Sequence, residues 1–351
     1  MVSPLPKYLA ISCALLILWA CLYPFSGWVV SGLPLFDYLV APWPKYFRVE
    51  DLVVNVAGYM PLGFVLVPAL PRRLRWPTAI ALATLLGALL SFTVETTQNF
   101  LPSRVSSNVD LGANTLGAFL GALVGAAFGR RLFGERGLHR WRMNNIVGGR
   151  MGDIGLVLAA VWLLVQCLPD RAAFTAGDLR SLLDLPAPLT FQPRPFAALE
   201  AAMVAASLLA IGLFVRCMMQ TSRLWPILLL LFLGLAAKSL ATWAFHVPGD
   251  ALLWLTPGTR TGLFIGAALL GLALCLPRVH QHAVAGVALL GAVTLTNLLP
   301  ENPYFGLYQL ISGNFQNFHG LIGLVSGAWP FFTLAYLSAL GLWRGEHLHN
   351  A

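Results

Sequence analysis

Charged side chains are scarce in this sequence. Asp, Glu, Lys and Arg together make up 10% of the 351 residues, whereas hydrophobic residues make up 58% and the mean hydropathy is +0.75. Soluble globular domains carry charges on about a quarter of their residues, so this composition excludes an ordinary soluble domain. It predicts an all-α protein that crosses a membrane several times, because a helix satisfies its own backbone hydrogen bonds inside lipid.

Cysteine pairs and familiar catalytic motifs are also lacking. The five cysteines lie in or beside apolar runs and form no C-x-x-C pair. We therefore expect neither a disulfide nor a metal centre, and no cofactor. The sequence contains no G-x-S-x-G, H-E-x-x-H, Walker or dinucleotide-binding motif, so no hydrolase, metalloprotease or nucleotide site of a familiar kind is predicted.

Long apolar runs are what the sequence has in abundance, and a membrane-spanning helix needs about 20 such residues. The first run, Tyr8 to Val30, is too long for a signal-peptide core, so we interpret it as a retained helix. With nine further runs, the sequence predicts a polytopic bundle of about ten spans. One of them, 260–276, is short enough to be re-entrant. The nine cover residues 52–70, 77–100, 111–128, 152–169, 195–216, 225–246, 260–276, 283–300 and 322–343.

Basic residues near the helix ends predict the orientation, because Lys and Arg that flank a span are retained in the cytoplasm. With the N-terminus inside, 14 of the 22 Lys and Arg residues fall in cytoplasmic gaps. Lys238 lies within an apolar run, and an even number of spans returns the C-terminus to the cytoplasm. The outer gaps hold Lys45, Arg48, Arg104, Arg171, Arg180, Arg194 and Arg260.

The net charge of +8 is distributed along helix ends rather than gathered on one soluble face. Anionic lipid of the inner leaflet is therefore the expected partner. Nucleic acid is not expected, because its binding needs a basic face exposed to water.

Polar residues inside the apolar runs carry the functional signal, since an ionisable group in a span costs about 3 kcal/mol or more. The second, third and fourth runs each contain a polar turn whose members repeat at helical spacing and so share a face. In the predicted topology all three turns lie at the outer membrane face. The candidate ligand-binding residues are Asp51, Asn55, Glu95, Gln98, Arg104, Asp110 and Asn114.

Two interpretations of these polar turns remain open. They can form a hydrogen-bond network that fixes the helix register, each bond contributing about 1 kcal/mol. However, Asp51, Glu95 and Asp110 outnumber Arg104, and neighbouring carboxylates repel one another unless a cation or a proton lies between them. A ligand, a metal or a proton-linked role is the alternative.

Glycine recurs at every fourth position of the fourth run, at Gly117, Gly121 and Gly125. Overlapping G-x-x-x-G frames let a neighbouring backbone approach closely. We therefore assign these glycines, together with Pro61 of the second run, a structural role.

The polar pattern resembles that of the VanZ-like family. The resemblance covers about residues 8–129 and implies a four-span membrane module in a multi-pass protein of the bacterial inner membrane. In the family's namesake this module is associated with low-level resistance to the glycopeptide teicoplanin. The matching motifs are Asp51-x-x-x-Asn55-x-x-Gly58-x-x-Pro61-x-Gly63, Glu95-x-x-Gln98, Arg104, and Asp110-x-x-x-Asn114-x-x-Gly117.

The second half of the chain lies outside this resemblance. Residues 130–151, rich in Arg and Gly, predict a cytoplasmic linker between the module of residues 1–129 and a second bundle of about six spans at 152–351. Glu200 and Lys238 are expected about 8 and 12 Å below the outer ends of their helices. These depths permit an intramembrane ion pair; alternatively, Lys238 extends toward the interface and Glu200 faces a cavity.

These features favour a module that binds or processes a lipid-linked or cell-envelope ligand at the outer face, with Arg104 contacting a phosphate. One alternative is a membrane enzyme in which Asp51, Glu95 and Asp110 hold a divalent cation and act on a phosphate ester. The other alternative is a proton-coupled transporter that uses Glu200 and Lys238. Neither the ligand nor the oligomeric state follows from the sequence.

Overall fold

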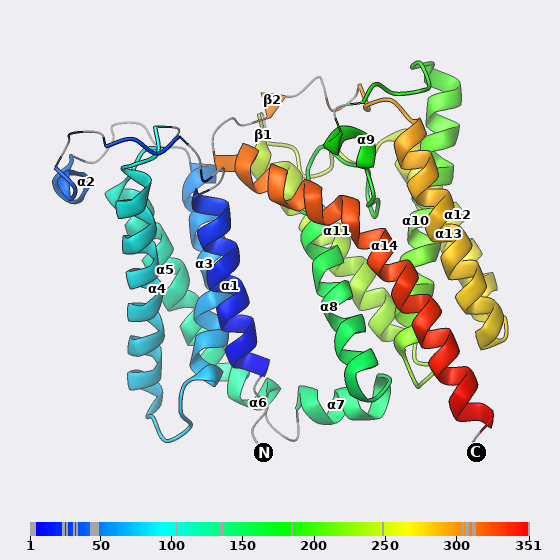
Figure 1. The fold of residues 1–351 in the computed structure, drawn as a ribbon, viewed down its shortest axis with the longest axis horizontal. Coiled ribbons are helices and arrows are strands. Elements are labelled where there is room, and N and C mark those ends of the chain that lie inside the picture. Colours follow the sequence, from blue (N-terminus) through cyan, green and yellow to red (C-terminus); the bar gives the residue numbers. More distant parts are fainter. Residues whose placement is uncertain are drawn as a thin grey trace. The chain divides into compact units, whose positions relative to one another are not determined.

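Helices make up nearly all the regular structure in the part of the chain that the computed structural model describes (Figure 1). The chain divides into two units, Met1–Arg142 with Ser312–Phe318, and Met143–Ile311 with His319–Ala351. The division at Arg142 falls inside the predicted linker 130–151. The described residues are 5–22, 25, 27–30, 32, 34–42, 49–102, 104–133, 137–183, 185–247, 249–303, 305, 309–310 and 314–349.

The first unit is organised around α5, which packs against α3 and α4, while α1 packs mainly against α3. Ser107 begins α5 as its N-cap, because its side chain accepts hydrogen bonds from two backbone N–H groups of the first turn. The elements are α1 (Leu5–Leu22), α2 (Asp37–Val40), α3 (Val49–Ala69), α4 (Trp76–Gln98), α5 (Asn108–Val124), a π-helical turn η1 (Gly125–Gly129), α6 (Arg130–Leu132) and α7 (Leu138–Asn145).

The glycines of α5 bring its backbone into direct contact with α3. A Cβ atom added at Gly117, Gly121 or Gly125 would overlap a main-chain carbonyl oxygen of α3, so the close approach predicted for this stripe is present. The contacts ascend both helices in the same direction, which makes α3 and α5 a parallel pair. They place Gly117 on Val56, Gly121 on Met60 and Gly125 on Phe64.

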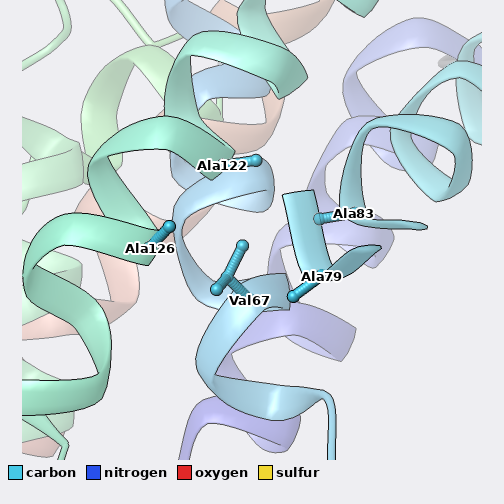
Figure 2. Close-up of a cluster of buried hydrophobic side chains, with 5 residues drawn as sticks. All are labelled: Val67, Ala79, Ala83, Ala122 and Ala126. Carbon is cyan, nitrogen blue, oxygen red and sulfur yellow. The ribbon is translucent and has the colours of Figure 1, made fainter. Parts of the chain in front are cut away.

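Small apolar side chains continue this packing away from the polar turns (Figure 2). Val67 of α3 lies against alanines of α4 and of the α5–η1 helix, and all five residues are almost completely buried. Alanine leaves the three helix backbones close together and adds no rotatable group. The apolar end of the unit is therefore closely packed, and this packing holds together the three helices that carry the polar residues. The cluster comprises Val67, Ala79, Ala83, Ala122 and Ala126.

The second unit is centred on α10, which packs against α12 and α13. A larger share of α10 is buried than of any other candidate span among the described helices. The elements are α8 (Gly149–Val165), α9 (Leu179–Leu182), α10 (Pro193–Met218), α11 (Trp225–Phe245), β1 (His246–Val247), α12 (Pro257–Leu274), α13 (Arg278–Leu298), β2 (Gln309–Leu310) and α14 (Asn314–His349). The two-residue strands β1 and β2 pair antiparallel.

The segment between α8 and α9 is buried in the second unit although it is not helical. Ala173 and Phe174 are 0% and 3% exposed. Side chains and neighbouring helices supply the hydrogen bonds that such a backbone needs in the absence of water. Gln166 Oε1 accepts from Phe174 N at 2.8 Å, and Gly177 N donates to the Ser326 carbonyl of α14 at 2.8 Å.

Eight of the described helices are long and apolar enough to cross a membrane: α3, α4, α5 with η1, α10, α11, α12, α13 and α14. They include α12, the helix of the run 260–276. The all-α transmembrane bundle is thus confirmed, and the estimate of about ten spans is approximate. The other two runs form α1 and α8, which are shorter than predicted. Helix α1 ends at Leu22, two residues before Pro24, a residue that disfavours helix at the preceding position. Helix α8 ends at Val165, where the buried segment begins.

The close contact of α3 and α5 predicts different effects of the same substitution at two glycines of α5. Gly121→Ala places a methyl group against the Met60 carbonyl, and we expect it to lower the free energy of unfolding by about 1–3 kcal/mol. Gly112→Ala is the matched control, because Gly112 is exposed with nothing within 4 Å of an added Cβ; it should be neutral or slightly stabilising. Denaturant unfolding of the purified variants in detergent measures both effects, and equal losses at the two positions would contradict the packing role.

Candidate functional site

Two helix N-termini meet at the polar end of the first unit. Asn55 Nδ2 on α3 donates a hydrogen bond of 2.6 Å to Asp110 Oδ1 in the first turn of α5. Asp51, one turn earlier on α3, is exposed and interacts electrostatically with Asp110. The parallel arrangement of α3 and α5 therefore brings these three predicted residues together.

Glu95, near the end of α4, joins that helix to the start of α5. Glu95 as a whole is only 4% exposed, and its Oε2 accepts a hydrogen bond of 2.9 Å from the Ser107 backbone N–H. The Glu95 carbonyl accepts a second bond, of 2.6 Å, from Ser106 Oγ. The carboxylate thus lies at the N-terminal end of α5, where the helix dipole favours a negative charge.

Gln98 and Arg104 reach a different helix. Gln98 Nε2 donates to the carbonyl oxygen of Cys21 at 3.0 Å, and Arg104 Nη2 donates to that of Ala20 at 3.1 Å. Both carbonyls belong to the last turn of α1, where intrahelical partners are missing and a cation is favoured. The sequence reasoning missed this role of α1. Pro24 was the available signal, because a helix that ends before it leaves carbonyls to be satisfied.

Arg104 is the unusual member of this set. The side chain is 8% exposed, its Nε is buried without a hydrogen-bond partner, and its only side-chain hydrogen bond within the described residues is the one to Ala20. Burial lowers the pKa of Arg104, and the nearby Cys21 and Glu95 oppose that shift; a guanidinium nevertheless stays protonated. The result is a buried cation that forms no direct ion pair with the carboxylates beside it.

Asn114 lies one turn deeper than Asp110 on α5. Its Nδ2 donates to Ser91 Oγ on α4 at 3.0 Å, while Oδ1 is buried without a hydrogen-bond partner. Six of the seven candidate residues therefore gather at the end of the unit, and Asn114 lies below them. Pro61 is exposed within α3 and takes no part in the polar contacts described.

The three carboxylates do not form a metal centre. Throughout the described residues, no group of three or more His, Cys, Asp or Glu side chains is placed to hold a metal ion. Glu95 is directed to Ser107 and Asp110 to Asn55. The three-carboxylate ligand set considered above is therefore not assembled among the described residues.

In the second unit, Glu200 and Lys238 have separate partners. Lys238, 1% exposed, donates to the carbonyl oxygen of Leu168 in the buried segment. The structure does not bring the two residues together as the predicted ion pair, because the N-terminal hydroxyls of α12 engage the carboxylate instead. Glu200 Oε1 accepts hydrogen bonds from Thr256 Oγ1 at 2.8 Å, Asn302 Nδ2 at 2.9 Å and Thr259 Oγ1 at 3.4 Å.

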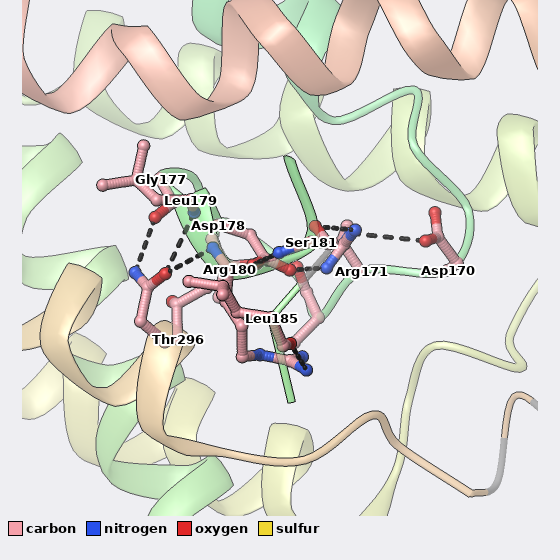
Figure 3. A network of polar contacts seen from close by, with 12 residues as sticks. Asp170, Arg171, Gly177, Asp178, Leu179, Arg180, Ser181, Leu185 and Thr296 are labelled. Carbon is pink, nitrogen blue, oxygen red and sulfur yellow. Dashed lines mark hydrogen bonds and ion pairs between the residues drawn. The ribbon is translucent and has the colours of Figure 1, made fainter. Parts of the chain in front are cut away.

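A second polar network, which the sequence did not predict, links the buried segment to α9 (Figure 3). Arg171 forms ion pairs with Asp170 and Asp178, and it donates to Ser181 Oγ at 2.7 Å. Asn297 of α13 accepts from two backbone N–H groups of α9 and donates to the Gly177 carbonyl. Sequence periodicity gives no signal for the contacts of Asn297, because they join α9 and the loop before it to a helix more than 100 residues away.

Comparison with known proteins agrees with the first unit. Residues 11–129 match the model of the VanZ/LLP1 family, which confirms the resemblance inferred from the polar motifs. No curated protein and no solved structure matches the chain. The family match ends where α5 and η1 end, so residues 130–351 have no described relative among these comparisons.

The separate partners of Glu200 and Lys238 predict independent effects on stability. Glu200→Ala removes the acceptor of two buried hydroxyls, those of Thr256 and Thr259, and of the half-buried Asn302 amide, and should cost on the order of 3 kcal/mol. Glu200→Gln keeps an acceptor oxygen and should cost less. Combined with Lys238→Met, Glu200→Gln should be additive within about 0.5 kcal/mol, because the two residues share no contact. Denaturant unfolding of the single and double variants supplies the double-mutant cycle. A coupling energy of about 1 kcal/mol or more would contradict this prediction and support a direct ion pair between Glu200 and Lys238.

Proposed function

We propose that the VanZ/LLP1-like module of residues 11–129 binds the phosphate of a lipid-linked or cell-envelope ligand at the outer membrane face. Arg104 supplies the cation that contacts the phosphate. The polar ends of α3, α4 and α5 form the surrounding walls.

The observation that carries this proposal is the buried, incompletely bonded guanidinium of Arg104. Only one of its nitrogens has a hydrogen-bond partner among the described residues, the Ala20 carbonyl, and its Nε has none. A buried polar group without a partner is costly, so the arrangement suits a ligand that supplies acceptors. A phosphate offers several oxygens in the geometry that a guanidinium matches.

The neighbouring carboxylates do not prevent an anion from binding beside Arg104. Glu95 accepts from the Ser107 N–H, and Asp110 accepts from Asn55. Both lie near the N-terminal end of α5, which offsets part of their negative charge. Arg104 is consequently the group of the cluster that remains available to an anionic ligand.

The depth of the cluster suits a headgroup. Glu95 lies three residues before the end of α4, which corresponds to about 5 Å along the helix axis. The outer location rests on the distribution of basic residues along the chain. The choice of an envelope ligand rests on the family's link to glycopeptide resistance, since glycopeptides target envelope precursors.

We expect substitution of Arg104 to weaken phosphate binding selectively. The probe is a polyprenyl phosphate with a photoreactive group, offered to the purified protein in detergent. Arg104→Gln should reduce crosslinking about tenfold, the effect of losing one charge-assisted hydrogen bond, and Arg104→Lys should retain part of it. Arg194→Gln is the matched control, because Arg194 is exposed and lies in the first turn of α10, beside a loop that is also predicted to be outer; it should crosslink like the wild type.

Two further readouts make that experiment decisive. Circular dichroism and gel filtration of each variant establish that Arg104→Gln is folded, since Arg104 also caps α1. Equal crosslinking of folded Arg104→Gln and the wild type would refute the proposed role of Arg104. Release of phosphate from the probe that EDTA abolishes would instead support the membrane enzyme.

A further inference from the structure

Two arginines of the second unit lie beside each other at the end opposite Glu200. Arg216 occupies the last turn of α10, and Arg278 is the first residue of α13. Arg278 Nη2 donates to the Gln220 carbonyl at 2.6 Å, and Arg216 Nη1 donates to the Thr221 carbonyl at 2.9 Å. Because the two acceptors belong to consecutive residues, the two guanidinium groups share one short loop.

This loop is fixed by contacts with the segment that precedes α8. Gln220 N donates to the Asn145 carbonyl at 2.8 Å, and Thr221 Oγ1 donates to Asn145 Oδ1 at 3.2 Å. Ile146 and Met219 form an antiparallel bridge directly beside these bonds. Asn145 is itself only 4% exposed. The loop that accepts the hydrogen bonds of both arginines is therefore itself hydrogen-bonded to the segment before α8.

The positive charges of this pair are not neutralised within the described part of the chain. Arg216 is 9% exposed, and Arg278 is close enough to interact with it electrostatically. Neither guanidinium forms an ion pair with a described carboxylate; each has the single carbonyl partner given above. Two like charges held together repel each other, and an anion bound between them relieves that repulsion. Each guanidinium retains unused N–H donors for such an anion.

We propose that Arg216 and Arg278 together bind one phosphate group. Paired guanidinium forks match phosphate oxygens in charge and geometry. Both residues lie at the ends of candidate spans, the level at which phospholipid headgroups are found. The phosphate belongs either to an anionic phospholipid or to a free anion. This site lies in the second unit and does not depend on the function proposed for residues 11–129.

Thermal unfolding of the full chain in detergent tests this site. The additives are short-chain phosphatidylglycerol, short-chain phosphatidylcholine and inorganic phosphate, each titrated separately. A ligand that binds the folded state raises the melting temperature in a concentration-dependent way. For the wild type we expect phosphatidylglycerol to raise it at lower concentration than phosphatidylcholine does. Arg278→Gln should require about tenfold more phosphatidylglycerol for the same rise.

Arg223→Gln is the matched control, because Arg223 lies in the same loop and is exposed, and the substitution removes the same charge. It should titrate like the wild type. Arg216→Gln should behave like Arg278→Gln; if it does not fold, the exposed Arg278 decides the question alone. A response to inorganic phosphate that Arg278→Gln weakens assigns the site to the free anion, whereas a response confined to phosphatidylglycerol assigns it to lipid. Identical titrations of wild type and Arg278→Gln with every additive would overturn the proposal.

Discussion

The parallel contact of α3 with α5 is the constraint on which the first unit depends. Glycine on α5 lets the two backbones touch, and the touching helices begin at the same end of the unit. Two N-terminal dipole ends consequently lie together, and carboxylates are favoured there. Asp110 and Glu95 occupy that region. Arg104 instead lies at the C-terminal end of α1, the negative end of that helix dipole, where a cation is favoured. The polar cluster is therefore ordered by helix polarity as well as by direct bonds.

The second unit meets a related constraint in another way. A non-helical segment within an apolar bundle must find a partner for each backbone group, because lipid supplies none. Gln166, Lys238 and Asn297 provide such partners from three different helix positions. Each of these polar residues would look costly in a hydropathy profile. Together they allow the chain to fold back into the bundle after α8.

The sequence pattern predicted which polar residues share a helix face. It did not predict which groups from distant parts of the chain become their hydrogen-bond partners. Helical spacing placed Asp51 and Asn55 on one face, and the topology placed Asp110 at the same end; the bond between Asn55 and Asp110 bears this out. The depths of Glu200 and Lys238 along their helices could also be estimated from the sequence. Depth does not determine which group lies opposite each side chain. The hydroxyls at the start of α12 and the carbonyl of Leu168 became their partners, and only the folded chain brings those groups near.

The period of the glycine stripe has a consequence for how the helices align. Gly117, Gly121, Gly125 and Gly129 are spaced alike, so a slide of α5 along α3 by four residues, about 6 Å, would still present glycines to Val56, Met60 and Phe64. Close packing alone thus permits more than one alignment. The hydrogen bond from Asn55 to Asp110 exists in only one of these alignments. This polar pair therefore selects the register of an otherwise repetitive contact.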